Sequence, residues 1–324
     1  MIRNDLCYAI TAGRPMLIDP LKAQAFLDNA NIILSNPDIA YHMSAWTDKY
    51  INKSEKKSRR SRAASPWGDD EDGPSGNELE NFFHELLEPK VEDNIGYIDV
   101  KGVIGKGLTK VERMLGCTDL CDIACTLDDW EKRDDVKDVV FRFDSGGGST
   151  TGLEEIAKKI RNYPKATTAY CEGDCGSAAY WLASQCDRFM VTPSSSIGAV
   201  GIYLTLKDLS EKYEKDGVKI TVIKSGDYKA AGVEHMPLTA LQFQRLQDEV
   251  VELHRRFIRD VMSVRAFVDE ENLQGQSFYG DESVKMGMAT SLVDEWKQAK
   301  AIIKANRAMA VSPVTSKLMA RNGM

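Results

Sequence analysis

The chain has 324 residues, of which 43% are hydrophobic and 28% charged, and its formal net charge is −7. This length suits one large domain or two of ordinary size. Mild acidity provides no general attraction to nucleic acid or anionic membranes. No apolar run has the length of a membrane span, and the N-terminus lacks the apolar core of a signal peptide. Seven cysteines, an odd number, argue against a disulfide framework. We therefore expect a cytoplasmic protein without nucleic-acid or membrane partners.

The N-terminal part divides into two segments by composition. Helical periodicity within residues 15–51 predicts a small N-terminal module, bounded at 1–52. Residues 53–76 are a basic run followed by an acidic run, with one apolar anchor, Trp67. Such a stretch buries too little apolar area to offset its ordering entropy, which predicts a polar charged linker over 53–90. The basic cluster could contact nucleic acid, but the neighbouring acidic run favours the linker interpretation.

Strands and helices alternate in the rest of the chain. Short apolar or alternating runs predict strands at 96–105, 136–143, 165–171, 187–192 and 218–223. Amphipathic runs predict helices at 119–132, 153–163, 177–185, 206–217 and 238–265. This alternation is typical of βαβ crossovers and a mainly parallel sheet. We expect one α/β domain over 91–300 and a C-terminal tail over 301–324.

A glycine-rich turn, Asp144-Ser-Gly-Gly-Gly-Ser149, follows a predicted buried strand and precedes a helix. Consecutive glycines permit unusual dihedral angles and close approach of a ligand, and amides in such a turn can bind an anion. The segment matches neither common nucleotide-binding glycine motif. Taken alone, it is explained as well by an ordinary strand-to-helix turn.

Ser177 begins a small apolar helix after Gly176. The amide of Ala178 lies in the first turn, where amides lack helical acceptors and the helix dipole is positive. A nucleophile requires this arrangement because an oxyanion forms beside it. The alternative is an N-cap serine without catalytic function.

Lys229 enters a small apolar stretch after the predicted strand 218–223. Burial would lower the pKa of this lysine and let the neutral amine act as a general base, whereas a solvated loop lysine is the alternative. No histidine lies between Ser177 and Lys229, and His235 is the one rival base. A Ser-Lys dyad therefore fits better than a Ser-His-Asp triad.

The cysteines offer a weaker candidate site. Cys117, Cys121 and Cys125 recur every four residues, but ligands on successive helical turns are too far apart for a compact zinc site. We interpret them as small hydrophobic residues and expect no metal or cofactor. Cys175 has no histidine at a recognisable spacing.

These segments together resemble peptidase family S49, the signal-peptide-peptidase A type, within the ClpP/crotonase superfamily. The resemblance covers roughly residues 94–296. It rests on the glycine turn, the helix at Ser177, the segment TPSSSIGAVGIY, the lysine segment KSGDYKAAG and the closing segment 276–294. It implies an α/β, ClpP/crotonase-like fold built from ββα and βαβ units, with the small helical module in front.

The resemblance also implies roles for individual residues. The nucleophile falls on Ser177, the general base on Lys229, and the oxyanion-hole amides on Gly147 and Ala178. Three positions depart from the family pattern, with Gly146 in place of proline, Asp144 in place of asparagine and Ala199 in place of the serine that orients the lysine. Ser196 and Thr205 are candidates for holding Lys229 instead.

The resemblance leaves several functions open. Without a membrane segment, the chain fits the tailed-phage capsid maturation proteases, which often start with a segment like RPMLIDPLKAQAFL. We expect a serine endopeptidase that cleaves capsid and scaffold proteins in the host cytoplasm or prohead. We also expect it to form a homo-oligomer and to remove its own C-terminal tail by self-cleavage. The alternatives are a bacterial signal-peptide-peptidase-like protease, a crotonase-type acyl-CoA enzyme and a non-catalytic head-assembly protein.

Overall fold

A computed structural model describes residues 16–18, 89–109, 112–113 and 115–309, with the backbone alone at 16–18 and 308–309. Most of the predicted N-terminal module and all of the predicted linker 53–90 except Pro89 and Lys90 lie outside these residues, and Lys90 begins a strand. Within the module, residues 16–18 form a strand where helical periodicity was expected. The described elements, in chain order, are β1 (Met16–Ile18), β2 (Lys90–Glu92), β3 (Ile95–Gly105), β4 (Thr118–Asp119), α6 (Leu120–Lys132), β5 (Asp138–Ser149), α7 (Leu153–Arg161), β6 (Ala166–Gly176), α8 (Ala178–Ser184), β7 (Arg188–Val191), β8 (Ser196–Gly198), α9 (Ser210–Lys215), α10 (Ala240–Val264), the 3-10 helix η2 (Glu270–Asn272), β9 (Ser277–Tyr279), α11 (Gly280–Lys285), β10 (Ser291–Leu292) and α12 (Trp296–Met309).

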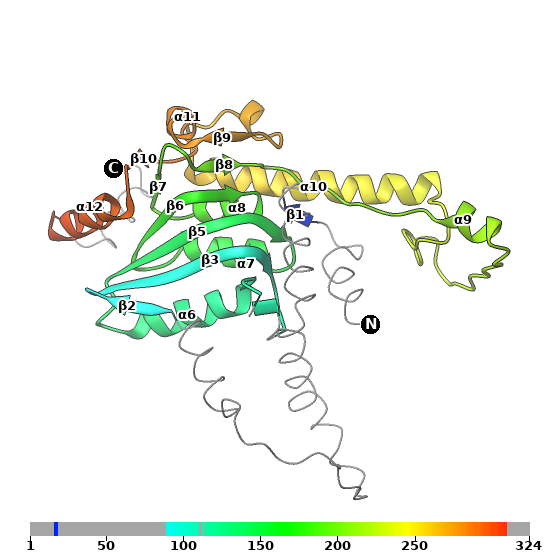
Figure 1. The fold of residues 1–324 in the computed structure, drawn as a ribbon, viewed down its shortest axis with the longest axis horizontal. Coiled ribbons are helices and arrows are strands. Elements are labelled where there is room, and N and C mark those ends of the chain that lie inside the picture. The colour runs from blue at the N-terminus through cyan, green and yellow to red at the C-terminus, as the bar shows by residue number, and fades with distance from the viewer. Residues whose placement is uncertain (1–15, 19–88, 110–111, 114, 310–324) are drawn as a thin grey trace, which may run out of the picture. The chain divides into compact units, whose positions relative to one another are not determined.

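The centre is a sheet in the order β10-β7-β6-β5-β3-β2. All neighbours along it are parallel except β2 and β3, which are antiparallel. Helices connect the parallel strands, as βαβ crossovers require. The predicted α/β class is therefore confirmed (Figure 1).

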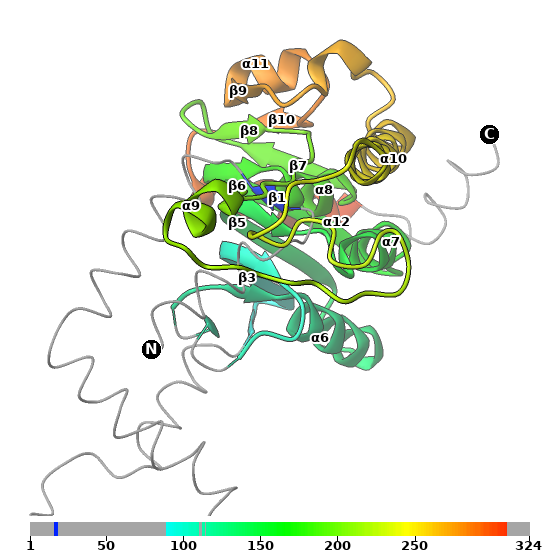
Figure 2. The same ribbon diagram turned by 90° about the vertical axis from the view of Figure 1, so that its right-hand side faces the viewer.

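Side chains of the sheet alternate between two apolar clusters. Val139, Phe141 and Phe143 of β5 pack in the larger cluster with α6, α7 and α8, whereas Val140 packs in a smaller cluster with α12. A period of two along β5 produces this division, because successive side chains point to opposite faces. α6, α7 and α8 thus cover one face of the sheet and α12 packs on the other. Figure 2 shows α6 and α7 along one side of the sheet.

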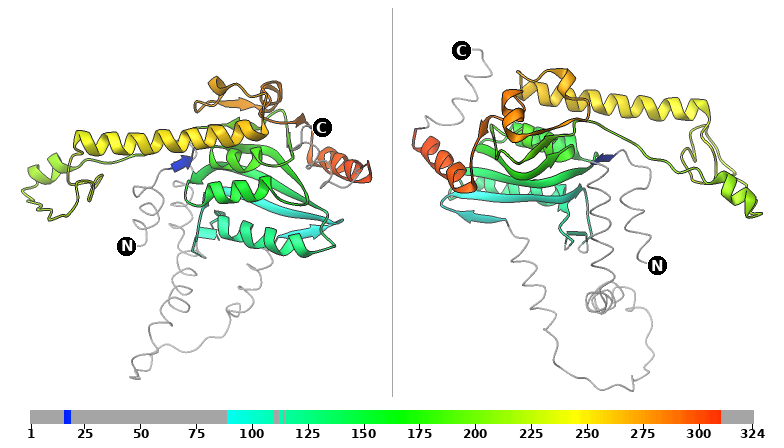
Figure 3. Two further views of the ribbon diagram at one scale, coloured as in Figure 1. Left: turned by 180° about the vertical axis from the view of Figure 1, so that it is seen from behind. Right: turned by 45° about the horizontal axis from the view of Figure 1, so that its top comes forward.

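The segment between β8 and α10 departs from the prediction. Residues 218–223, the predicted strand VKITVI, pair with no strand and are irregular. Every residue from 201 to 241 is at least partly exposed. This segment, which contains α9, and the first residues of α10 form an arm that extends away from the sheet (Figure 3). We call residues 203–245 the arm.

α10 has 25 residues but carries charges on its exposed face. None of the helices described has both the length and the apolar content of a membrane span.

Candidate active site

Three segments singled out in the sequence meet at the N-terminus of α8. β5 and β6 remain paired as far as Ser145 and Cys175, and β8 pairs with the end of β6, Gly176 opposite Gly198. A Cβ placed on Gly176 would lie 3.4 Å from the carbonyl oxygen of Gly146 and 3.6 Å from Cβ of Ala199. The glycine turn, the serine segment and the segment around Ala199 are therefore in direct contact.

Ser177 occupies the N-cap position of α8 without acting as a cap. Its φ is 54° and its ψ is −116°, and its side chain makes no capping hydrogen bond. Its backbone amide donates to the carbonyl oxygen of Gly198 at 2.7 Å. A non-glycine residue in this conformation costs of the order of 1–3 kcal/mol, and such strain is concentrated at functional sites. A sharp strand-to-helix turn of this kind presents the nucleophilic serine in α/β-hydrolases.

The two amides predicted to bind an oxyanion differ in their hydrogen bonding. Ala178 is the first residue of α8, fully buried, and its amide is among those that a helix leaves without a helical acceptor. Gly147 has a φ of 116°, and its amide donates to Oγ of Ser145 at 3.1 Å. Oγ of Ser145 in turn donates to the carbonyl oxygen of Gly102 at 2.5 Å. An oxyanion would therefore compete with Ser145 for the Gly147 amide.

α8 is held in place from its far side by α10. The Trp181 ring stacks on Phe257 with centroids 4.5 Å apart and an interplanar angle of 5°, and its Nε1 donates to Oδ2 of Asp260 at 3.1 Å. Asp260 also forms ion pairs with Arg161 of α7 and with Arg259. Because Ser177 directly precedes α8, these contacts position the serine. The sequence reasoning missed this role, although the amphipathic pattern of residues 238–265 shows that α10 packs against something.

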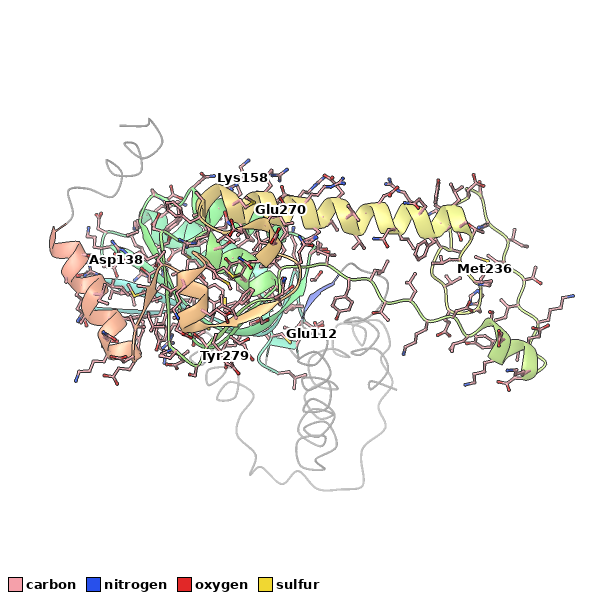
Figure 4. The ribbon with its side chains drawn as sticks, turned by 90° about the horizontal axis from the view of Figure 1, so that it is seen from above. Glu112, Asp138, Lys158, Met236, Glu270 and Tyr279 are labelled. Atoms are coloured by element: carbon pink, nitrogen blue, oxygen red, sulfur yellow. The ribbon has the colours of Figure 1, made fainter. Side chains whose placement is uncertain are left out.

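Lys229 lies in the arm, away from Ser177. It is exposed, and its amide donates to the carbonyl oxygen of Gly226 at 3.2 Å. The neighbouring Asp227 accepts a 2.7 Å hydrogen bond from Nε2 of Gln242, near the N-terminus of α10. α10 packs on α8 at Phe257, about 22 Å further along the helix at 1.5 Å per residue. Figure 4 shows the arm, with Met236 at its outer part, well away from the sheet.

The single chain therefore assembles three of the four predicted site residues, and Lys229 stays outside the site. Ser196 remains with the serine segment, since β8 pairs it with Asp174, while Thr205 is exposed at the start of the arm. Neither is positioned by the described contacts to hold Lys229 within one chain.

The histidines and cysteines considered in the sequence analysis lie outside the group formed by Ser177, Gly147 and Ala178. Nε2 of His254 lies 2.9 Å from the carbonyl oxygen of Leu273, and Cys175 is fully buried. Cys117 precedes α6, so the three cysteines do not share one helix, and burial raises the pKa of the Cys117 thiol to about 12. His235 is partly buried within the arm. Among the described residues, no group of three metal-binding side chains occurs.

Residues 159–311 match the model of peptidase family S49. The resemblance read from the motifs is thereby confirmed.

Curated relatives include proteins of two phages. The chain is 25% identical to the head-tail preconnector protein GP5 of Enterobacteria phage P21, over 90% of this chain and 56% of that protein. It is 24% identical to capsid assembly protease C of Escherichia phage lambda, over 63% of this chain and 48% of that one. A protein of Methanocaldococcus jannaschii, named as a candidate protease, is 30% identical over 52% of this chain and 55% of its own length. The chain thus spans about half the length of the curated relatives it matches.

Similar solved structures include an enoyl-CoA hydratase/isomerase from Marinobacter aquaeolei, 12% identical with a TM-score of 0.44, covering 73% of this chain and 82% of that one. They also include a membrane-bound stomatin-specific protease, 12% identical with a TM-score of 0.37, covering 62% and 81%.

Proposed function

Since the chain carries a region of peptidase family S49, we propose that it is a serine endopeptidase in which Ser177 is the nucleophile and Lys229 the general base. The observation that carries this proposal is the conformation of Ser177. The serine is held at positive φ, does not cap its helix, and lies beside the turn of Gly146 and Gly147. An N-cap serine would use its side chain to satisfy a helix amide, and this one does not.

The reaction follows from this arrangement. Nζ of Lys229 takes the proton of Ser177 as Oγ attacks the peptide carbonyl carbon. The amides of Gly147 and Ala178 hold the negative charge that develops on the carbonyl oxygen. The C–N bond then breaks, the amine leaves with the proton from Lys229, and an acyl ester remains on Ser177. Water attacks the ester, returns a proton to Oγ and releases the acid.

Lys229 reaches the site from a second copy of this chain. Within one chain it is separated from the α8 region by most of α10, and a general base must come within hydrogen-bonding distance of its proton. The arm also exposes apolar side chains without forming a core of its own. Ile223 is 96% exposed, and the others are Val218, Ile220, Tyr228, Leu241 and Phe243. Exposed apolar surface of this extent marks an association surface, and a homo-oligomer in which arms cross between copies would bury it.

The substrates are proposed from the relatives. Two of them are a capsid assembly protease and a head-tail preconnector protein of phages. We therefore assign capsid and scaffold proteins as substrates, cleaved during head maturation in the prohead within the host cytoplasm.

The test is co-expression of the chain with the capsid and scaffold proteins of the same phage, followed by mass spectrometry of their termini. Ser177→Ala should abolish cleavage, and Lys229→Arg should be nearly as damaging because arginine does not act as a neutral base. Ser194→Ala and Lys224→Arg are the matched controls, since both side chains are exposed and neither residue is assigned a role in the reaction. Full cleavage by the Ser177 variant would contradict the assignment, and cleavage absent in the unaltered chain too would favour a non-catalytic assembly protein.

A further inference from the structure

β5 continues beyond the point where β6 leaves it. The last pair between the two strands is Ser145 and Cys175, after which the chain turns through Gly176 into Ser177 and α8. On its other side, β5 remains paired with β3 as far as Gly148 opposite Ile104. Gly147 and Gly148 therefore have one edge occupied by β3, and the second edge of residues 147–149 opens where the chain turns toward Ser177.

β1 fills this second edge. Met16, Leu17 and Ile18 pair antiparallel with Ser149, Gly148 and Gly147 respectively. β1 lies at the carboxyl end of β5 in Figure 1 and in both views of Figure 3. Neighbouring strands are 4.7–4.9 Å apart, so the backbone at Ile18 lies directly beside Gly147.

This position is that of a substrate's main chain, an inference that rests on the proposed function. A peptide whose carbonyl oxygen reaches the amides of Gly147 and Ala178 must pass Gly147 as an extended segment. The edge of residues 147–149 offers such a segment main-chain pairing in the antiparallel sense, which is how extended peptides bind to open sheet edges. The two glycines at 147 and 148 leave this part of the edge free of side chains.

We propose that residues 16–18 are a self-docked strand that occupies the substrate-binding edge of β5, so that an extended peptide substrate must displace it. The class of ligand for this edge is an extended apolar peptide without proline at its paired residues. The occupant has these properties, because its three residues are Met-Leu-Ile. Prolines at positions 15 and 20 bound the segment, and proline has no amide hydrogen with which to extend the pairing. A pairing limited to three residues is short enough for a longer peptide to replace it.

Hydrogen exchange tests the docking without relying on catalysis. The full chain with Ser177→Ala is compared with two chains that carry one further substitution. Leu17→Pro removes the amide hydrogen of this residue and disfavours strand pairing, whereas Leu17→Val keeps the amide hydrogen and favours a strand. We expect those amides of residues 147–149 that face β1 to exchange at least tenfold faster in the proline variant and at the unaltered rate in the valine variant. Equal exchange in all three chains would overturn the proposal.

Peptide binding tests the same edge from the ligand's side. A fluorescein-labelled peptide of residues 14–20 is titrated into the same three chains and its anisotropy followed. It should bind the Leu17→Pro chain at least tenfold more tightly than the other two, while a peptide with proline in place of its leucine should not bind. Equal affinity for all three chains, or equal binding of both peptides, would overturn the proposal.

Activity separates this proposal from the proposed function. With Ser177 intact, Leu17→Pro should lower KM for labelled casein several-fold and leave kcat unchanged. The Leu17→Pro chain could show faster exchange and tighter peptide binding while no chain shows Ser177-dependent cleavage. That result would support the docked strand and contradict the peptidase assignment. Unchanged KM in a chain whose cleavage depends on Ser177 would reject the docked strand and retain the peptidase.

Discussion

Mixing two inactive variants determines whether the serine and the lysine of one site come from different copies. The variants are Ser177→Ala, which keeps the lysine, and Lys229→Ala, which keeps the serine. The lysine segment is hydrogen-bonded to α10 at Gln242, and α10 packs on α8 at Phe257, about 22 Å further along the helix. A general base must come within about 3 Å of the proton that it takes, so Lys229 cannot serve the Ser177 of the same copy in the described conformation.

The magnitude follows from random assembly. In an equal mixture, half of the copies contribute an intact serine and half an intact lysine. Sites built from two copies should therefore show about a quarter of the unaltered activity, whereas sites built within one copy should show none. The two variants are co-expressed from one vector with the capsid and scaffold proteins, and cleavage is quantified by mass spectrometry.

Dilution provides the control. The unaltered chain is mixed in equal amounts with the double variant Ser177→Ala/Lys229→Ala. Sites shared between copies should retain about a quarter of the activity, and sites within one copy about half. An inactive variant mixture together with half activity on dilution would refute the crossed-arm assembly.

Three further predictions concern the scaffold of the site. Phe257→Ala removes a fully buried ring stacked on Trp181 and should lower the free energy of unfolding by about 4 kcal/mol in denaturant titrations, and a loss below 1 kcal/mol would contradict the packing. Gly148→Ala would place Cβ 1.9 Å from the carbonyl oxygen of Ile104, so thermal unfolding should begin well below that of the unaltered chain, and an unchanged melting temperature would show that β3 can shift. Burial alone would raise the pKa of Asp119, but hydrogen bonds from three backbone amides and an arginine outweigh burial and lower it. Asp119 therefore contributes stability above its unfolded pKa of about 4, which is lost as pH falls toward the lowered folded pKa, and Asp119→Asn should weaken this acid dependence of the melting temperature by removing a titrating group.

Much of the fold was predictable from local pattern. The alternation of β3 and the amphipathic periodicity of α7, with Leu153, Ile156, Ala157 and Ile160 buried, locate these elements to within a few residues. Such elements are determined by which face must be apolar, and the sequence contains that information directly. The sequence also identifies the three segments that meet at the start of α8.

One strand prediction was wrong for a physical reason. Residues 218–223 have the β-branched composition of a strand, but a strand exists only where a neighbour pairs with it. The arm offers no such neighbour within the chain. Conversely, β5 and β6 run on through glycine-rich residues expected to be turns, because pairing to β3 and β8 holds the backbone extended there.

The sequence by itself determined the α/β class, the order of its elements, the resemblance to peptidase family S49 and the candidate site residues. Only the tertiary structure decided how these residues are related in space. It showed that Ser177 does not cap its helix, that Lys229 lies on an arm, and that Met16–Ile18 pairs beside Gly147. Local composition specifies faces and turns, whereas the pairing of distant segments depends on edges and distances that exist only in the folded chain.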